Sequence, residues 1–275
     1  MLTGRLIRDN DAQLQFDVMS WLINRYGPPQ KPKVPSPLQR PEQLSTLSWQ
    51  SDDTRNVHEW AIDNFEQIKN DCGISEWSVQ IAPQADNTHS GKHMSFSQDW
   101  NVTSKEPYYV DGYGRPIIHY DPLQCDAPGY FAARIILKLA EIKLMSFTPE
   151  REVSPLESKI MTLTAASYMR QGFTLAALPQ MVKAYFSTDD KAAEVNRRII
   201  TNSLAVSTCT ILLSHRLTTE QIVATYGTVM TKRFRRKIRP ACKQIETYES
   251  EIKLMRLRVS PPSQHVANAD NAAAA

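Results

Sequence analysis

Apolar residues recur three or four positions apart along most of the second half of the chain. This spacing puts them on one face of a helix, so it predicts helices rather than strands. The predicted helices span residues 156–171, 175–186, 193–215 and 217–227. Gly172 separates the first two, and Thr218 or Thr219 caps the last. Pro240 is expected to break the helix or start a turn within residues 228–258.

Two further helices are expected near the N-terminus. Helical spacing covers residues 11–26, and it returns from a cap at Ser51 or Asp52 to Cys72. The six prolines of residues 28–41 favour an extended connector between these helices. The last residues show no apolar pattern and are expected to be disordered. The predicted units are residues 1–50 (helix and proline-rich connector), 51–258 (main domain) and 259–275 (disordered tail).

Strands are predicted only in the first half of the chain. Residues 76–84 alternate, with Trp77, Val79 and Ile81 on one side, and residues 115–121 form another apolar strand. The second strand leads through a short loop into a long apolar helix over residues 132–146. The predicted fold class is therefore α+β, with a small N-terminal sheet, a central long helix and a mostly helical C-terminal half.

Composition adds few constraints. The net charge of +3 is too small to imply a polyanionic partner by itself. No run of about 18 apolar residues is found, which predicts no membrane span. The N-terminus lacks the apolar core of a signal peptide, and the cysteines form no C-x-x-C pair. These features predict a cytoplasmic protein with reduced thiols. The four cysteines are Cys72, Cys125, Cys209 and Cys242.

Five blocks of the sequence, in their order, carry a resemblance to a known family. They are FDVMSWLINRYG, CGISEWSVQIAPQ, PIIHYDPLQCDAPGYFAARIILKLAEIKLMS, LTTEQIVATYG and KIRPACKQIETYESEIKLM. Together they resemble a group of uncharacterised bacterial proteins with a zincin-like domain, the type found in H-E-x-x-H metallopeptidases. The resemblance extends over most of residues 16–257. It implies a zincin-like α+β fold, in which the strand, loop and helix of residues 115–146 would present the metal motif.

The resemblance also implies metal ligands that this chain lacks. Where the motif has His, Glu and His, the chain has Leu137, Lys138 and Glu141, and Ser158 stands near the expected third, acidic ligand. Leucine offers no lone pair, lysine would place a positive charge beside the metal ion, and one carboxylate holds zinc weakly. The general base is missing too. We therefore predict a non-catalytic pseudo-peptidase without metal or cofactor, acting through protein binding or assembly.

The histidines offer a weaker alternative metal site. His89 and His93 are four residues apart, which would align two ligands on a helix, but they lie in a polar stretch with glycine and serine. Surface histidines are the favoured interpretation. His119 is expected to pack or to bond a carbonyl group, whereas His58 and His215 are expected to be exposed or capping.

A run of basic residues is the strongest charge feature. Residues 231–243 hold no acid, and Phe234 and Ile238 interrupt the cations. Such a run could neutralise phosphates, but no known nucleic-acid-binding signature accompanies it. A solvated face or a patch for an acidic protein is favoured over nucleic acid, with Glu246, Glu249 and Glu251 as expected counter-charges. The basic residues are Lys232, Arg233, Arg235, Arg236, Lys237, Arg239 and Lys243.

Two other groups remain as candidates. Lys138 and Glu141 are three residues apart and could pair or form a repurposed catalytic pair, although a core role for Leu137 in a metal-independent fold is favoured. Tyrosines flank the central helix, and they suit a contact surface or a packed sheet face equally well. The tyrosines are Tyr108, Tyr109, Tyr113, Tyr120 and Tyr130.

Overall fold

The structure, a computed structural model, describes residues 5–31, 54–83, 116–178 and 191–259, except 121, 123–124, 126–127 and 229. Most of this part is helical, with one small sheet, so the α+β class is confirmed at that level. The proline-rich connector beyond Lys31 and the tail from residue 260 lie outside it. The elements are α1 (Asp9–Tyr26), α3 (Thr54–Asp71), β1 (Gln80–Pro83), β2 (Ile117–Tyr120), α4 (Pro128–Leu144), α5 (Pro155–Tyr168), α6 (Gly172–Ala177), α8 (Lys191–Ser214), α9 (Thr219–Tyr226), α10 (Lys232–Ile245) and α11 (Glu249–Val259).

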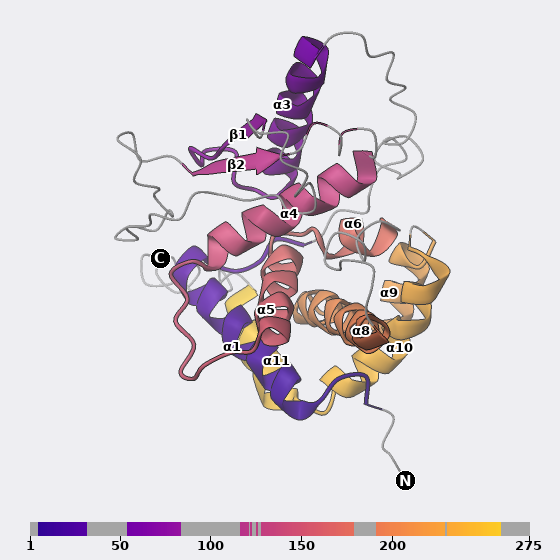
Figure 1. The fold of residues 1–275 in the computed structure, drawn as a ribbon. Coiled ribbons are helices and arrows are strands. Elements are labelled where there is room, and N and C mark those ends of the chain that lie inside the picture. The colour runs from indigo at the N-terminus through magenta and orange to yellow at the C-terminus, as the bar shows by residue number, and fades with distance from the viewer. Residues whose placement is uncertain are drawn as a thin grey trace, which may run out of the picture.

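Helix α4 lies between two layers of the molecule. Figure 1 shows α3 and the sheet on one side of α4, and α1, α5 and α8 on the other. Every residue of α4 except Tyr130, Lys138 and Glu141 is buried, because apolar residues occupy most of the helix circumference. The expected central helix of residues 132–146 is confirmed, although it begins at Pro128 and ends at Leu144.

The sheet is smaller than the sequence pattern suggests. β1 and β2 pair in parallel, with Ile81 opposite Ile118. Trp77, Val79 and Ile81 are buried, whereas Ser78 and the first residue of β1 are exposed, which confirms the predicted alternation. Only four residues of each strand are paired, so the expected strand over residues 76–84 is too long. One face of the short sheet packs against α3.

Helix α8 is the centre of the C-terminal layer. It packs between α5 and α10, and small polar residues line its contact with α5. The hydroxyls of Ser167 and Ser207 are 2.9 Å apart, and that of Thr208 is 3.2 Å from Ser167 Oγ. These short side chains let the two helices approach closely. Within the described ranges, no helix combines the length and apolar character that crossing a bilayer requires.

Local side-chain signals define several helix ends. Thr218 caps α9 by accepting from Gln221 N, and Gln221 Oε1 accepts from Thr218 N, forming a capping box. The predicted cap at Thr218 is therefore confirmed. Arg216, two residues after the end of α8, adopts a left-handed φ of 62°, and Leu217 N donates to Leu212 O. This pattern closes the end of a helix and usually employs glycine.

Two expectations for the C-terminal half are wrong. Pro240 lies inside α10, which runs through it without interruption. The carbonyl that loses its donor belongs to Arg236, an exposed residue of α10. The helix expected over residues 175–186 begins earlier, at Gly172, and is interrupted after Ala177, where Leu178 is extended. The rest of the expected range, residues 179–186, lies outside the described residues.

Gln244 of α10 fastens the N-terminal segment to the helical layer. Its buried carboxamide oxygen accepts from Leu6 N at 2.8 Å and Ile7 N at 3.2 Å, and its nitrogen donates to Ile7 O at 2.9 Å. Asn202 of α8 donates to Leu6 O at 2.7 Å. The backbone groups of Leu6 and Ile7, before α1, are thus bonded to side chains of α8 and α10.

Candidate functional site

The positions of the resembled zinc motif form a core contact and an ion pair on α4. Leu137 is 4% exposed and belongs to the hydrophobic core, as expected. Lys138 Nζ lies 2.6 Å from Glu141 Oε2, and both side chains are partly buried. An amine that is paired with the carboxylate one turn away is held by it as a counter-ion. The two side chains therefore neutralise each other.

The position expected for a third ligand serves as the start of a helix. Ser158 is exposed on the first turn of α5. Its neighbour Glu157 accepts from Ser154 N and Ser154 Oγ, both at 2.9 Å, and from Arg151 Nη2 at 2.6 Å. These bonds, that from Arg151 first, lower the pKa of Glu157 to about 2. The carboxylate is occupied in capping α5.

The histidines are not gathered into a ligand set in the part of the chain that is described. Among those residues, no three His, Cys, Asp or Glu side chains converge as metal ligands would. His58 is wrongly predicted as exposed or capping, because its Nδ1 lies 2.8 Å from the Tyr120 hydroxyl and its ring stacks on that tyrosine. His119 and His215 are half-buried. His89 and His93 lie outside the described residues.

The tyrosine group divides between buried and undescribed positions. Tyr120 is fully buried, and its ring meets Phe131 edge-on at 5.7 Å, so this residue packs the sheet against α4. Tyr130 is half-buried beneath the guanidinium of Arg134. The remaining three, Tyr108, Tyr109 and Tyr113, lie outside the described residues.

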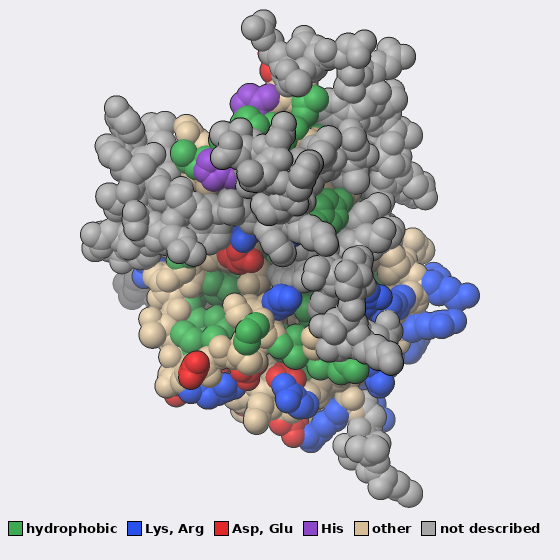
Figure 2. Space-filling model, viewed as in Figure 1, with side chains coloured by type: hydrophobic (Ala, Val, Ile, Leu, Met, Phe, Trp, Pro, Cys, Tyr) green, Lys and Arg blue, Asp and Glu red, His purple; other side chains and the backbone are tan. Residues whose placement is uncertain are grey.

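Helix α10 presents its basic residues to solvent. Phe234 and Ile238 are buried against α8, so the cations between them point outward. Figure 2 shows Lys and Arg side chains projecting at the right-hand edge, where Figure 1 places α10. All seven are exposed except Lys237, which is half-buried. We call this surface the basic face; its residues are Lys232, Arg233, Arg235, Arg236, Lys237, Arg239 and Lys243.

Few acidic groups approach the basic face within the described part of the chain. Arg239 lies 3.6 Å from Glu220, and both side chains are mostly exposed. The expected counter-charges are not confirmed, because Glu249 pairs instead with Lys253 at 2.8 Å on its own helix. An exposed pair at such distances contributes little. Glu220 therefore offsets little of the positive charge of Arg239.

A hollow of about 300 Å³ opens between α8 and α10 at one end of the basic face. Thr201 and Asn202 of α8 are buried, whereas Arg198 of the same helix is exposed. Burial and the nearby charges of Arg198 and Arg233 lower the pKa of Lys237. The hollow thus gathers cations from two helices. Its lining is Val195, Arg198, Thr201, Asn202, Arg233 and Lys237.

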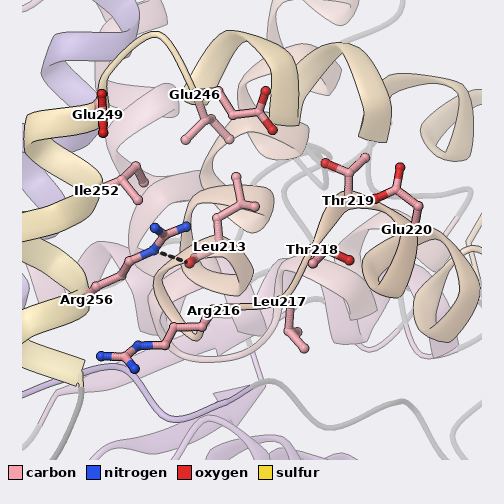
Figure 3. Close-up of a pocket in the computed structure, with 11 residues that line it drawn as sticks. Leu213, Arg216, Leu217, Thr218, Thr219, Glu220, Glu246, Glu249, Ile252 and Arg256 are labelled. Atoms are coloured by element: carbon pink, nitrogen blue, oxygen red, sulfur yellow. Dashed lines mark hydrogen bonds between the residues drawn. The ribbon is translucent and has the colours of Figure 1, made fainter.

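A larger pocket of about 740 Å³ lies where α8, α9, α10 and α11 meet. Figure 3 shows the guanidinium groups of Arg216 and Arg256 at one end and the carboxylate of Glu246 at another. Arg256 Nε donates to Leu213 O at 3.1 Å, which fixes this side chain against the end of α8. This pocket is lined by both positive and negative side chains, so it favours neither an anionic nor a cationic ligand.

The most buried lysine of α4 lies among aromatic rings. Lys143 Nζ is 4.0 Å from the ring centroid of Tyr26, 4.5 Å from that of Trp77 and 5.7 Å from that of Tyr168. Burial lowers the pKa of Lys143 to about 8. The rings stabilise the ammonium form and partly offset this cost. Lys143 joins α1, α4 and α5 and is 6% exposed.

Sequence reasoning missed the α8 half of the hollow and the surroundings of Lys143. The consecutive arginines Arg197 and Arg198 were a signal for the former, since they end the polar start of a long helix. No sequence signal places Lys143 beside Trp77 and Tyr168, which come from separate segments.

Comparison of the chain with protein-family models, with curated proteins and with solved structures finds no match.

Proposed function

We propose that this protein is a non-catalytic, zincin-like binding protein that docks an acidic protein partner on the basic face. The observation that carries the proposal is the outward side of α10, where six of the seven cations are exposed and Lys237 is half-buried. An acidic partner would bring carboxylates to these cations and would associate rapidly through the positive field.

The surroundings of α4 support the non-catalytic part of the proposal. Leu137 fills core space, and Lys138 and Glu141 are bound to each other at 2.6 Å. The order of β2, the following loop and α4 supports a zincin-like scaffold, because the same order presents H-E-x-x-H in the resembled proteins. A repurposed enzyme using Lys138 and Glu141 would first have to break their ion pair.

Chemistry at the basic face favours a protein over nucleic acid. The aromatic residue of α10, Phe234, is buried and unable to stack on a base. Val195, which is 62% exposed, borders the cations at the hollow and offers an apolar contact beside them. Mixed apolar and charged contacts are typical of protein interfaces. Nucleic acid is the second candidate, because the cations of α10 would neutralise phosphates equally well.

The test measures binding of fluorescent poly-L-glutamate and of a DNA duplex of equal total charge. The variant reverses Arg235, Arg236 and Arg239 to Glu. The wild-type protein is expected to bind poly-L-glutamate at low salt, and the variant is expected to lose at least about tenfold in affinity, equivalent to about 1.4 kcal/mol. The matched control reverses three exposed cations elsewhere, Arg216, Lys253 and Arg258.

The outcomes separate the candidates. Preferential binding of poly-L-glutamate, lost in the α10 variant and kept in the control, supports the proposal. Preferential binding of the duplex would replace it with the nucleic-acid alternative. Equal losses in both triple variants would mean that net charge, and not the basic face, governs binding. Failure of the wild-type protein to bind either polyanion would overturn both candidates.

A further inference from the structure

Three charged side chains of the larger pocket, between α8, α9, α10 and α11, have no ion-pair partner in the described part of the chain. They are Arg216, Glu246 and Arg256. Arg216 and Glu246 are exposed and Arg256 is half-buried, so a ligand in the pocket can reach all three. The other two acids of the lining, Glu220 and Glu249, have basic partners of their own. A ligand would therefore meet unpaired charges of both signs.

The protein itself holds Arg256 in place. Its Nε donates to Leu213 O at 3.1 Å, and Figure 3 shows the guanidinium between Leu213 and Ile252. The two Nη groups have no acceptor among the described residues, so they are available to a ligand as a fork. The lowered pKa of Glu249 is due first to its hydrogen bond from Lys253 and only last to Arg256. A carboxylate suits such a fork, because its two oxygens accept both N–H bonds.

Apart from its charges and two threonines, the pocket is lined by aliphatic side chains. Leu213, Ile245 and Ile252 are buried residues of the core that also line it, and the half-buried Leu217 joins them. Among the described residues, no aromatic side chain belongs to the lining. Bases and quaternary ammonium groups are typically bound by aromatic rings, so the lining disfavours both kinds of ligand. It suits aliphatic groups instead.

Charge and size together select a short peptide. A ligand with one sign of charge would leave either Glu246 or Arg256 without a partner, so a ligand with both an ammonium and a carboxylate group fits better. In a single amino acid these two groups share one carbon atom, whereas Figure 3 shows Glu246 and Arg256 at different ends of the pocket. An extended tripeptide spans about 10 Å. The pocket volume of about 740 Å³ accommodates it.

We propose that this pocket binds a short peptide with aliphatic side chains and two free termini. The terminal carboxylate would pair with Arg256, and the terminal ammonium group would pair with Glu246. Arg216, at the same end of the pocket as Arg256 in Figure 3, would attract the carboxylate too. The peptide side chains would lie against Leu213 and Ile252. This ligand and this site are separate from the acidic partner and the basic face, so the inference goes beyond the proposed function.

The test is a calorimetric titration at pH 7 with four forms of one tripeptide, alanine-leucine-alanine. The forms have free termini, an acetylated N-terminus, an amidated C-terminus, or both caps. We expect each cap to weaken binding to the wild-type protein about tenfold, because it removes one charge-assisted contact. In Glu246→Gln the acetyl cap is expected to cost less than about twofold, whereas the amide cap still costs about tenfold. Arg256→Met is expected to show the reverse.

Matched controls are Glu251→Gln and Arg258→Met, on α11 but outside the pocket lining, and both should respond to the caps as the wild type does. Glu246→Gln changes an exposed side chain without a bond in the described part of the chain, so it decides the test even if Arg256→Met fails to fold. Equal binding of the free and doubly capped peptides would overturn the proposal, as would no binding of any form. So would caps that cost the same in the wild type and in Glu246→Gln. None of these outcomes depends on whether the basic face binds poly-L-glutamate.

Discussion

Lys143 Nζ lies 4.0 Å from the centroid of the Tyr26 ring, so a cation from the central helix is held against an aromatic side chain of α1. The same nitrogen lies 4.5 Å from the Trp77 ring. The site joins the N-terminal helix, the segment before β1 and α4. It therefore lies at the junction of the two layers that α4 separates.

Replacing Lys143 with Met is expected to change how stability depends on pH. Burial lowers the folded-state pKa of Lys143 to about 8, whereas the unfolded chain keeps the ordinary value near 10.5. Between these values the unfolded chain binds more protons, so wild-type stability gains with rising pH relative to the variant. The gain between pH 8 and 9.5 amounts to at most about 2 kcal/mol.

Urea unfolding of both proteins at pH 7 and pH 9.5 measures this difference. The tyrosines of both unfolded chains ionise alike, and burial raises the pKa of Tyr26 and Tyr168 beside Lys143. Tyrosine ionisation is therefore expected to cancel when the two free energies of unfolding are subtracted. Lys253→Met, at an exposed position of α11, is the control and is expected to show no such pH dependence. If the free energies of unfolding of wild type and Lys143→Met change equally between pH 7 and pH 9.5, burial does not lower the pKa of Lys143.

Gly172→Ala is expected to destabilise the contact between α6 and α8. An added Cβ would lie 2.2 Å from Thr208 Oγ1 and 2.9 Å from Ser167 Oγ, so side chains or helices would have to move. Overpacking of this kind costs about 1–3 kcal/mol. A thermal or chemical unfolding curve measures the loss.

A double-mutant cycle identifies the cause. Thr208→Ala removes the atom in closest approach, so it should recover part of the cost of Gly172→Ala. If the losses in unfolding free energy of the two substitutions simply add, the close contact between position 172 and Thr208 is contradicted.

Glu157→Gln tests the cap of α5. The pKa of Glu157 is lowered to about 2 by Arg151 and Ser154, so the carboxylate stabilises the fold above about pH 4.5 and loses this contribution as the pH falls through about 2. The variant keeps an acceptor but no charge. Because the pair is close to solvent, the expected loss at pH 7 is at most about 1 kcal/mol.

Unfolding midpoints at pH 7 and pH 2 check this expectation. The wild type and Glu157→Gln should differ at pH 7 and converge at pH 2. Glu152→Gln, at an exposed position before the cap, is the control. A difference that persists undiminished at pH 2 would mean that the charge of Glu157 is not its source.

Local patterns in the sequence predicted much of the fold. Helical periodicity located α1, α4 and α8 to within a few residues, and the hydroxyl of Thr218 located the start of α9. These signals act over one or two helical turns, so they are readable along the chain. Pro240 was misinterpreted because proline is usually disfavoured inside a helix, whereas α10 continues through it.

Long-range relationships could not be predicted in the same way. The basic run was evident, but its continuation onto Arg198 depends on how α8 and α10 pack. Lys143 looked like an ordinary charge near the end of a helix. Its burial against Tyr26 and Trp77 requires the whole arrangement of α1, α4 and the segment before β1. Neither the position of Arg198 beside α10 nor the burial of Lys143 produces a periodic pattern in the sequence.

Lysine footprinting can show whether α10 is the docking surface. The protein is acetylated briefly with and without poly-L-glutamate, and the modification of each lysine is quantified by mass spectrometry. We expect protection of Lys232, Lys237 and Lys243, with Lys253 of α11 unchanged as the internal control. Protection of Lys253 without the three lysines of α10, or equal protection of all four, would contradict it.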